Sequence, residues 1–185
     1  MNPPLPDILP LTPYLREIVW GGRRLQRFGK DLPPDVPIGE AFEVSALPGQ
    51  ECTAASGPLS GLGLREILHR YGQELVGAAV QARYGDNFPL LIKLIDAQDD
   101  LSIQVHPNDA YARAEGLGTF GKTEAWYVLH SDGARLALGL QDGTDEAALR
   151  RALTEARVEQ AVLYQDVAVD DVILLQAGTV HALCR

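Results

Sequence analysis

The chain has 185 residues, 46% of them hydrophobic and 22% charged, which are values typical of one globular domain of ordinary size. No apolar run approaches the ~18 residues that a membrane-spanning helix needs, and the proline-rich start lacks the basic and apolar segments of a signal peptide. The net charge of −9 would repel the phosphate backbone of a nucleic acid. We therefore expect a cytoplasmic protein without membrane or nucleic-acid partners, whose two cysteines, Cys52 and Cys184, are free thiols.

The first half of the chain mixes loops, strands and helices. Residues 1–50 are rich in proline and glycine around short apolar runs, a pattern typical of strands and loops. Residues 59–85 predict two short helices, which begin after Gly63, are separated near Gly72 and end near Gly85. The first of them carries an apolar stripe made of Leu64, Ile67 and Leu68.

The second half is dominated by predicted strands. Short apolar or alternating runs bounded by Asp, Asn, Gly and Pro predict strands at residues 90–95, 101–105, 125–129, 135–140 and 172–175. One helix is predicted after Thr144, its N-cap, with acidic residues in the first turn. Many short strands with few helices indicate a β-rich α+β fold, either a sandwich or a jelly roll.

Three segments place polar side chains where they could act together. Alternation along residues 101–106 puts Ser102, Gln104 and His106 on one face of a strand. Taken alone, this segment indicates an ordinary strand whose polar face contacts water. In a second strand Lys122 and Glu124 share a face, and His181 follows a predicted turn at residues 177–178. Together the segments supply two imidazoles, one carboxylate and one amide oxygen, a donor set suited to zinc or to non-haem iron.

Over nearly its whole length, the chain resembles the type I mannose-6-phosphate isomerases of the cupin superfamily. The resemblance is carried by an ordered series of motifs at residues 18–22, 38–45, 61–77, 89–100, 102–107, 121–129 and 177–183. It implies a cupin-type jelly roll with a few short helices, in which residues 1–185 form a single metal-binding domain with a helical insertion around 59–85. On the same resemblance, we expect the C-terminal domain of the family to be absent.

The resemblance also implies an activity and a site. The family interconverts mannose 6-phosphate and fructose 6-phosphate with a catalytic Zn²⁺, so the expected partner is a sugar phosphate. The implied metal ligands are Gln104, His106, Glu124 and His181. Lys122 is the implied catalytic residue, and the implied substrate contacts are Trp20, Lys93 and Ser102.

The sequence is also compatible with two other functions and with an oligomer. The sequence ends four residues after His181, whereas an arginine thought to serve catalysis follows in the family. This favours, as an alternative, a catalytically weak or inactive metal-binding cupin that binds sugar phosphate or acts as an interaction module. An iron-dependent cupin oxygenase is a third reading of the donor set. Strands without a partner at this end would leave an apolar face, which predicts a homodimer.

Overall fold

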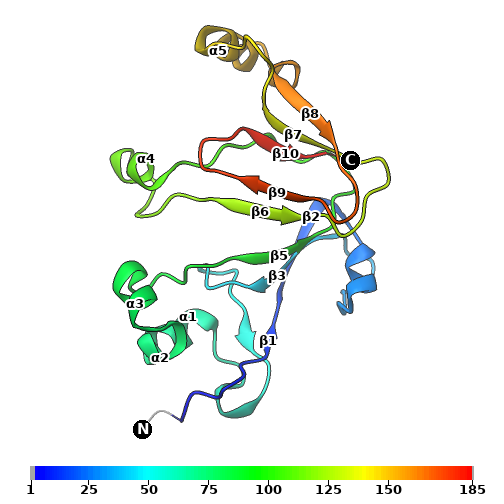
Figure 1. The fold of residues 1–185 in the computed structure, drawn as a ribbon. Helices are drawn as coiled ribbons and strands as arrows, with labels where there is room; N and C mark the ends of the chain where they lie inside the picture. Colours follow the sequence, from blue (N-terminus) through cyan, green and yellow to red (C-terminus); the bar gives the residue numbers. More distant parts are fainter. Residues whose placement is uncertain (1–2, 185) are drawn as a thin grey trace. The chain divides into compact units, whose positions relative to one another are not determined.

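The computed structural model describes residues 3–184, which form two compact units that meet in the sequence between Gln98 and Asp99. We call them the N-terminal unit and the C-terminal unit. Each consists mainly of short antiparallel strands with a few short helices (Figure 1). The β-rich α+β class predicted from the sequence is therefore confirmed. Within residues 3–184, no helix is both long and apolar enough to cross a membrane.

A three-stranded antiparallel sheet lies at the centre of the N-terminal unit, in the order β2-β3-β5. Its strands are β2 (Tyr14–Gly22), β3 (Ile38–Val44) and β5 (Ile92–Ile95). The smaller elements of this part are β1 (Leu11–Thr12), which pairs with β4 (Thr53–Ala54), and the 3-10 helices η1 (Arg24–Phe28) and η2 (Gly57–Leu59). The middle strand β3 is buried over its first five residues, because it has a neighbour along both edges.

Three short helices follow η2 in the same unit. They are α1 (Leu64–Tyr71), α2 (Gln73–Val76) and α3 (Ala78–Tyr84). As predicted, the first begins after Gly63, the last ends before Gly85, and the apolar stripe of α1 is buried. The structure has three helices instead of the two predicted, because Gly77 interrupts the second with a φ of +83°. This left-handed conformation favours glycine.

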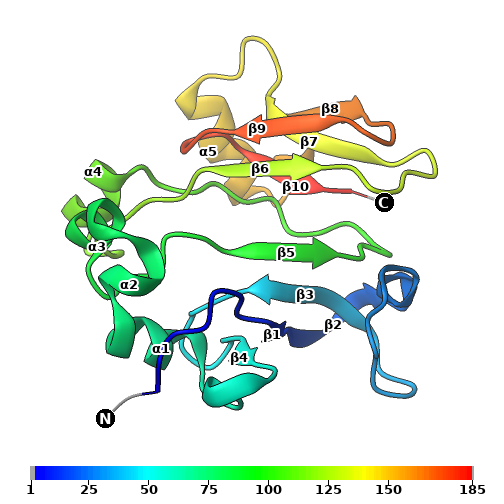
Figure 2. The same cartoon turned by 60° about the horizontal axis from the view of Figure 1, so that its bottom comes forward.

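The C-terminal unit contains a three-stranded sheet, in the order β10-β7-β8, and the strand pair β6-β9. Its strands are β6 (Glu124–Tyr127), β7 (Arg135–Leu140), β8 (Val162–Asp166), β9 (Val172–Leu175) and β10 (His181–Leu183). Its helices are α4 (Asp109–Ala114), α5 (Glu146–Thr154) and the 3-10 helix η3 (Val158–Gln160). β9 runs beside β6, and β8 beside β7, in both views (Figures 1 and 2). The predicted strands at 135–140 and 172–175 are confirmed, and the one predicted at 125–129 begins one residue earlier.

Two local predictions were wrong in this unit. Residues 101–105 do not form a regular strand: only Gln104 makes a bridge, to His181, and Leu101 donates one further bond to Leu183 O. Val105 in this segment is exposed. The helix at 146–154 is capped by Asp145 instead of Thr144, and the Asp145 carboxylate accepts a hydrogen bond from Ala148 N. A carboxylate in this position also interacts favourably with the helix dipole, which explains why aspartate takes the cap.

The outward face of the β6-β9 pair is apolar. Tyr127 lies opposite Val172 and Ala125 lies opposite Leu174, and all four residues are exposed. Contiguous exposed apolar side chains often mark an interaction surface. The homodimer predicted from the sequence remains a prediction, and this apolar face is its candidate interface. Light scattering at micromolar concentration is expected to give about twice the chain mass of 20.1 kDa, and a mass equal to one chain contradicts the dimer.

Candidate metal centre

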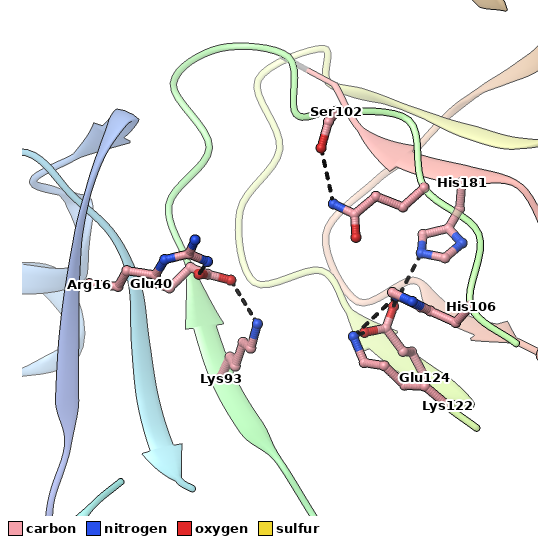
Figure 3. A network of polar contacts seen from close by, with 9 residues as sticks. Arg16, Glu40, Lys93, Ser102, His106, Lys122, Glu124 and His181 are labelled. Atoms are coloured by element: carbon pink, nitrogen blue, oxygen red, sulfur yellow. Dashed lines mark hydrogen bonds and ion pairs between the residues drawn. The ribbon is translucent and has the colours of Figure 1, made fainter. Parts of the chain in front are cut away.

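Three side chains from separate segments of the C-terminal unit meet in one cluster. His106 lies in the loop before α4, Glu124 is the first residue of β6, and His181 is the first residue of β10. Their ligand atoms all lie within 4.8 Å of one another. Figure 3 shows the carboxylate of Glu124 pointing toward both imidazoles. The structure therefore brings together three of the four residues that the sequence implies as metal ligands.

The distances in this cluster fit a tetrahedral ion. Oε2 of Glu124 lies 3.3 Å from Nε2 of His181 and 3.6 Å from Nε2 of His106. Two ligands bound at about 2.0–2.1 Å to one tetrahedral zinc ion are separated by about 3.4 Å. Glu124 thus lies at a suitable distance from each imidazole to share an ion with it. Two imidazoles and a carboxylate are also the chemistry that binds zinc or ferrous iron.

His181 is held by neighbours that fix which nitrogen faces the cluster. Its Nδ1 lies 2.7 Å from the carbonyl oxygen of Thr179, and a carbonyl oxygen can only accept a hydrogen bond. Nδ1 therefore carries the proton, and in the neutral ring Nε2 keeps its lone pair for a metal. The turn before it contains Gly178, with a φ of +90°, and the ring of Trp126 packs edge-on at 5.5 Å. The hydrogen bond to the Thr179 carbonyl oxygen could not be predicted from the sequence, because every residue has a backbone carbonyl group.

Gln104 and Ser102 lie next to this cluster. The backbones of Gln104 and His181 exchange two hydrogen bonds of 2.8 Å, so these residues stand directly opposite each other in an antiparallel bridge. Opposite residues in such a pair project to the same face. The amide nitrogen of Gln104 lies 3.3 Å from Oγ of Ser102, to which it donates, and its Oε1 remains the atom suited to a cation. The fourth implied ligand thus adjoins His181, and Ser102 holds its side chain.

Lys122 places an ammonium group against two of the donors. Its Nζ lies 3.2 Å from Nε2 of His106 and pairs with Oε1 of Glu124. Burial alone raises the pKa of Glu124, but the hydrogen bond and the charge of Lys122, with smaller contributions from the two imidazoles, lower it below its usual value. The carboxyl is therefore ionised at neutral pH, which is the form that binds a cation.

The other two predicted site residues, Trp20 and Lys93, belong to the N-terminal unit. Trp20 lies on β2, where its ring packs over Gly39: a Cβ at Gly39 would come within 2.5 Å of the ring. Lys93 lies on β5, where its ammonium pairs with Glu40. Each of them is fixed by neighbours within its own unit. Glu40 itself stands in one of the motifs that carry the family resemblance, residues 38–45.

Comparison with solved structures defines the class of fold. The crystal structure of the mannose 6-phosphate isomerase from Bacillus subtilis matches with a TM-score of 0.82 and 36% sequence identity, over 94% of this chain and 54% of that one. A protein from Archaeoglobus fulgidus described as a mannosephosphate isomerase matches with a TM-score of 0.76 at 22% identity, over 96% of this chain and 59% of that chain, which bears on the fold alone. The expected cupin-type jelly roll with a few short helices is therefore confirmed.

Sequence comparison gives the family. Residues 8–151 match the family described as phosphomannose isomerase type I, catalytic domain. The chain is 35% identical over 175 residues to the mannose-6-phosphate isomerase of Streptococcus mutans, covering 94% of this chain and 53% of that protein. This chain belongs to the type I phosphomannose isomerase family, and it spans about half the length of the curated relatives that it matches.

Proposed function

We propose that the chain carries the metal centre of a zinc-dependent aldose-ketose isomerase that interconverts mannose 6-phosphate and fructose 6-phosphate. The observation that carries this proposal is the spacing of His106, Glu124 and His181, which suits one tetrahedral ion, with an ammonium group beside it. Membership of the family supplies the reaction and the sugar-phosphate substrate. The proposed ligands are these three residues together with Gln104.

The proposed ligands do not neutralise the charge of the ion that they would bind. One carboxylate with two neutral imidazoles and an amide oxygen leaves a divalent ion with a net charge of +1. Zinc held in this way supplies a Lewis acid that stabilises negative charge on a sugar oxygen. The imidazole of His181 is already oriented by Thr179, with its Nε2 3.3 Å from Oε2 of Glu124.

Lys122 is proposed as a catalytic residue. The isomerisation removes a proton from one of the two carbons C1 and C2 and returns one to the other, and negative charge builds on the adjacent oxygen in between. An ammonium next to the metal ligands places positive charge where this oxygen would lie. Lysine suits the role because its charge is compact, whereas arginine spreads its charge over a planar fork. Ser102, Trp20 and Lys93 are proposed contacts of the substrate.

Turnover by the metal-loaded chain tests the proposed function. In an assay that couples formation of fructose 6-phosphate from mannose 6-phosphate to a second enzyme, zinc-loaded protein is expected to turn over. A chelator should abolish the activity, and added zinc should restore it. A folded, zinc-loaded sample without turnover contradicts the isomerase and leaves a metal-binding cupin. Purification without added metals, followed by elemental analysis, is expected to yield zinc; iron would point to the oxygenase chemistry instead.

A further inference from the structure

Two hydrogen bonds link the start of α4 to the segment before β6 in the C-terminal unit. The amide of Gly121 donates a hydrogen bond of 2.8 Å to Oδ1 of Asp109, the first residue of α4 and 12 positions away in the sequence. The amide of Lys122 donates one of 3.0 Å to the carbonyl oxygen of Pro107. We call these two hydrogen bonds the Asp109 clamp. Because they come from successive residues, they hold the two segments in one register.

The close approach of the two segments requires a glycine at position 121. A Cβ at Gly121 would come within 2.5 Å of the carbonyl carbon of Asn108, and closer still to the carbonyl oxygen of Pro107. Both atoms belong to the backbone, which cannot move aside as the end of a flexible side chain can. The φ of Gly121 is not positive, so glycine is needed here for space and not for an unusual conformation. The segments are therefore packed backbone against backbone.

Lys122 needs such a support because it lies before the paired part of β6. The pairing of β6 with β9 begins at Glu124, and within residues 3–184 no strand pairs with residues 121–123. The sheet therefore holds Glu124 but not Lys122, and Lys122 is not a proposed ligand that an ion would hold. Its ammonium nevertheless lies 3.2 Å from Nε2 of His106 and pairs with Oε1 of Glu124 (Figure 3). The clamp supports the backbone from which this side chain extends.

We propose that Asp109 is a positioning residue, which holds the backbone of Lys122 so that its ammonium stays beside the metal ligands. This inference rests on the proposed function for the catalytic role of Lys122. The clamp itself lies within the C-terminal unit and does not depend on the identity of the substrate. Exact placement matters for such a group, because a shift of about 1 Å in a catalytic side chain can lower a rate by about 100-fold.

Amide hydrogen exchange, followed by NMR on the zinc-loaded protein, tests the clamp without any need for turnover. The Gly121 amide is expected to be protected in the unchanged protein. Asp109→Ala removes its acceptor, so exchange at Gly121 should become at least about tenfold faster. Asp109→Asn keeps an acceptor oxygen in the same position and should retain most of the protection. Equal protection of Gly121 in Asp109→Ala and in the unchanged protein overturns the clamp.

Turnover shows whether the clamp acts through Lys122. Asp109→Ala should retain one zinc per chain, while kcat/KM falls by about tenfold or more. Asp109→Asn should recover most of this loss, which a role for the charge of Asp109 would not allow. In the double variant Asp109→Ala/Lys122→Ala, kcat/KM should equal that of Lys122→Ala alone, because a support has no effect once the supported group is gone. A further loss of about tenfold in the double variant overturns the positioning role.

A matched control removes an equivalent hydrogen bond at α5. Oδ1 of Asp145 accepts a hydrogen bond of 2.7 Å from Ala148 N, and Asp145→Ala should leave both kcat/KM and the protection of Gly121 unchanged. If Asp109→Ala fails to fold, Asp109→Ser decides the question, because its shorter side chain also withdraws the acceptor from Gly121.

The outcomes separate the clamp from the proposed function. Faster exchange at Gly121 in Asp109→Ala, together with no turnover in the unchanged protein, keeps the clamp and refutes the isomerase. Turnover with the same kcat/KM in Asp109→Ala and in the unchanged protein keeps the isomerase and refutes the positioning role of Asp109.

Discussion

Glu124→Gln is expected to abolish stoichiometric zinc binding. The substitution keeps the shape of the side chain but removes the one carboxylate of the cluster, whose Oε2 lies 3.3 Å and 3.6 Å from the two imidazole nitrogens. A neutral amide is a weaker donor to a divalent cation, and zinc would retain its full charge among neutral ligands. Zinc affinity should fall by more than about 100-fold. Loss of a residue that only hydrogen-bonds to a metal ligand already lowers metal affinity by about 10- to 100-fold. Elemental analysis after gel filtration measures the zinc content per chain.

Two further variants make this result specific. His106→Ala removes a different donor and should lose zinc as completely. Glu115→Gln removes an exposed carboxylate of the same unit, outside the cluster, and should keep one zinc per chain. Bound zinc should also raise the thermal unfolding midpoint of the control and of the unchanged protein, but not that of Glu124→Gln, because a ligand that binds only the folded state stabilises it. Full zinc content in both Glu124→Gln and His106→Ala means that the ligand assignment is wrong.

The helices and strands that could be predicted are those that depend only on residues close together in the sequence. Glycine marks the start and end of the helices at 64–84, and short apolar runs mark β7 and β9, because these signals depend only on neighbouring residues. Residues 101–105 alternate as a strand does, yet their only bridge to β10 is the one between Gln104 and His181, beside a single hydrogen bond from Leu101 N to Leu183 O. Pairing depends on a partner that is distant in the sequence. Local pattern does not contain that information.

The same distinction applies to the functional groups. The donors of the metal centre were proposed from residue type, alternation and family likeness, and their convergence follows from the β6-β9 pairing and the turn before His181. The ion pairs that Glu40 forms with Arg16 and Lys93 were not predicted, because they depend on the register of three strands. The Thr179 carbonyl has no sequence signal at all. The chemistry of each side chain is known from the sequence, whereas its contacts with residues on neighbouring strands are not.

Lys122→Ala is expected to separate metal binding from catalysis. Nζ of Lys122 contacts Glu124 and His106 without being a metal ligand, so the variant should retain one zinc per chain. Loss of the ammonium removes positive charge from beside the reacting oxygen, and kcat/KM should fall by about 100-fold or more, which corresponds to about 2.7 kcal/mol of transition-state stabilisation. Binding of fructose 6-phosphate should weaken as well.

The chain contains its own control for this experiment. It has three lysines, and Lys30 forms an ion pair with Glu43 in the N-terminal unit; neither of these two residues is proposed for catalysis or binding. Lys30→Ala therefore removes the same charge and should leave kcat/KM unchanged. Lys122→Arg keeps the charge but replaces a compact ammonium by a planar fork, so it should recover part of the loss. Unaltered kcat/KM and sugar-phosphate affinity in Lys122→Ala would exclude this residue from the reaction, because a group that stabilises the reacting oxygen cannot be removed without raising the barrier.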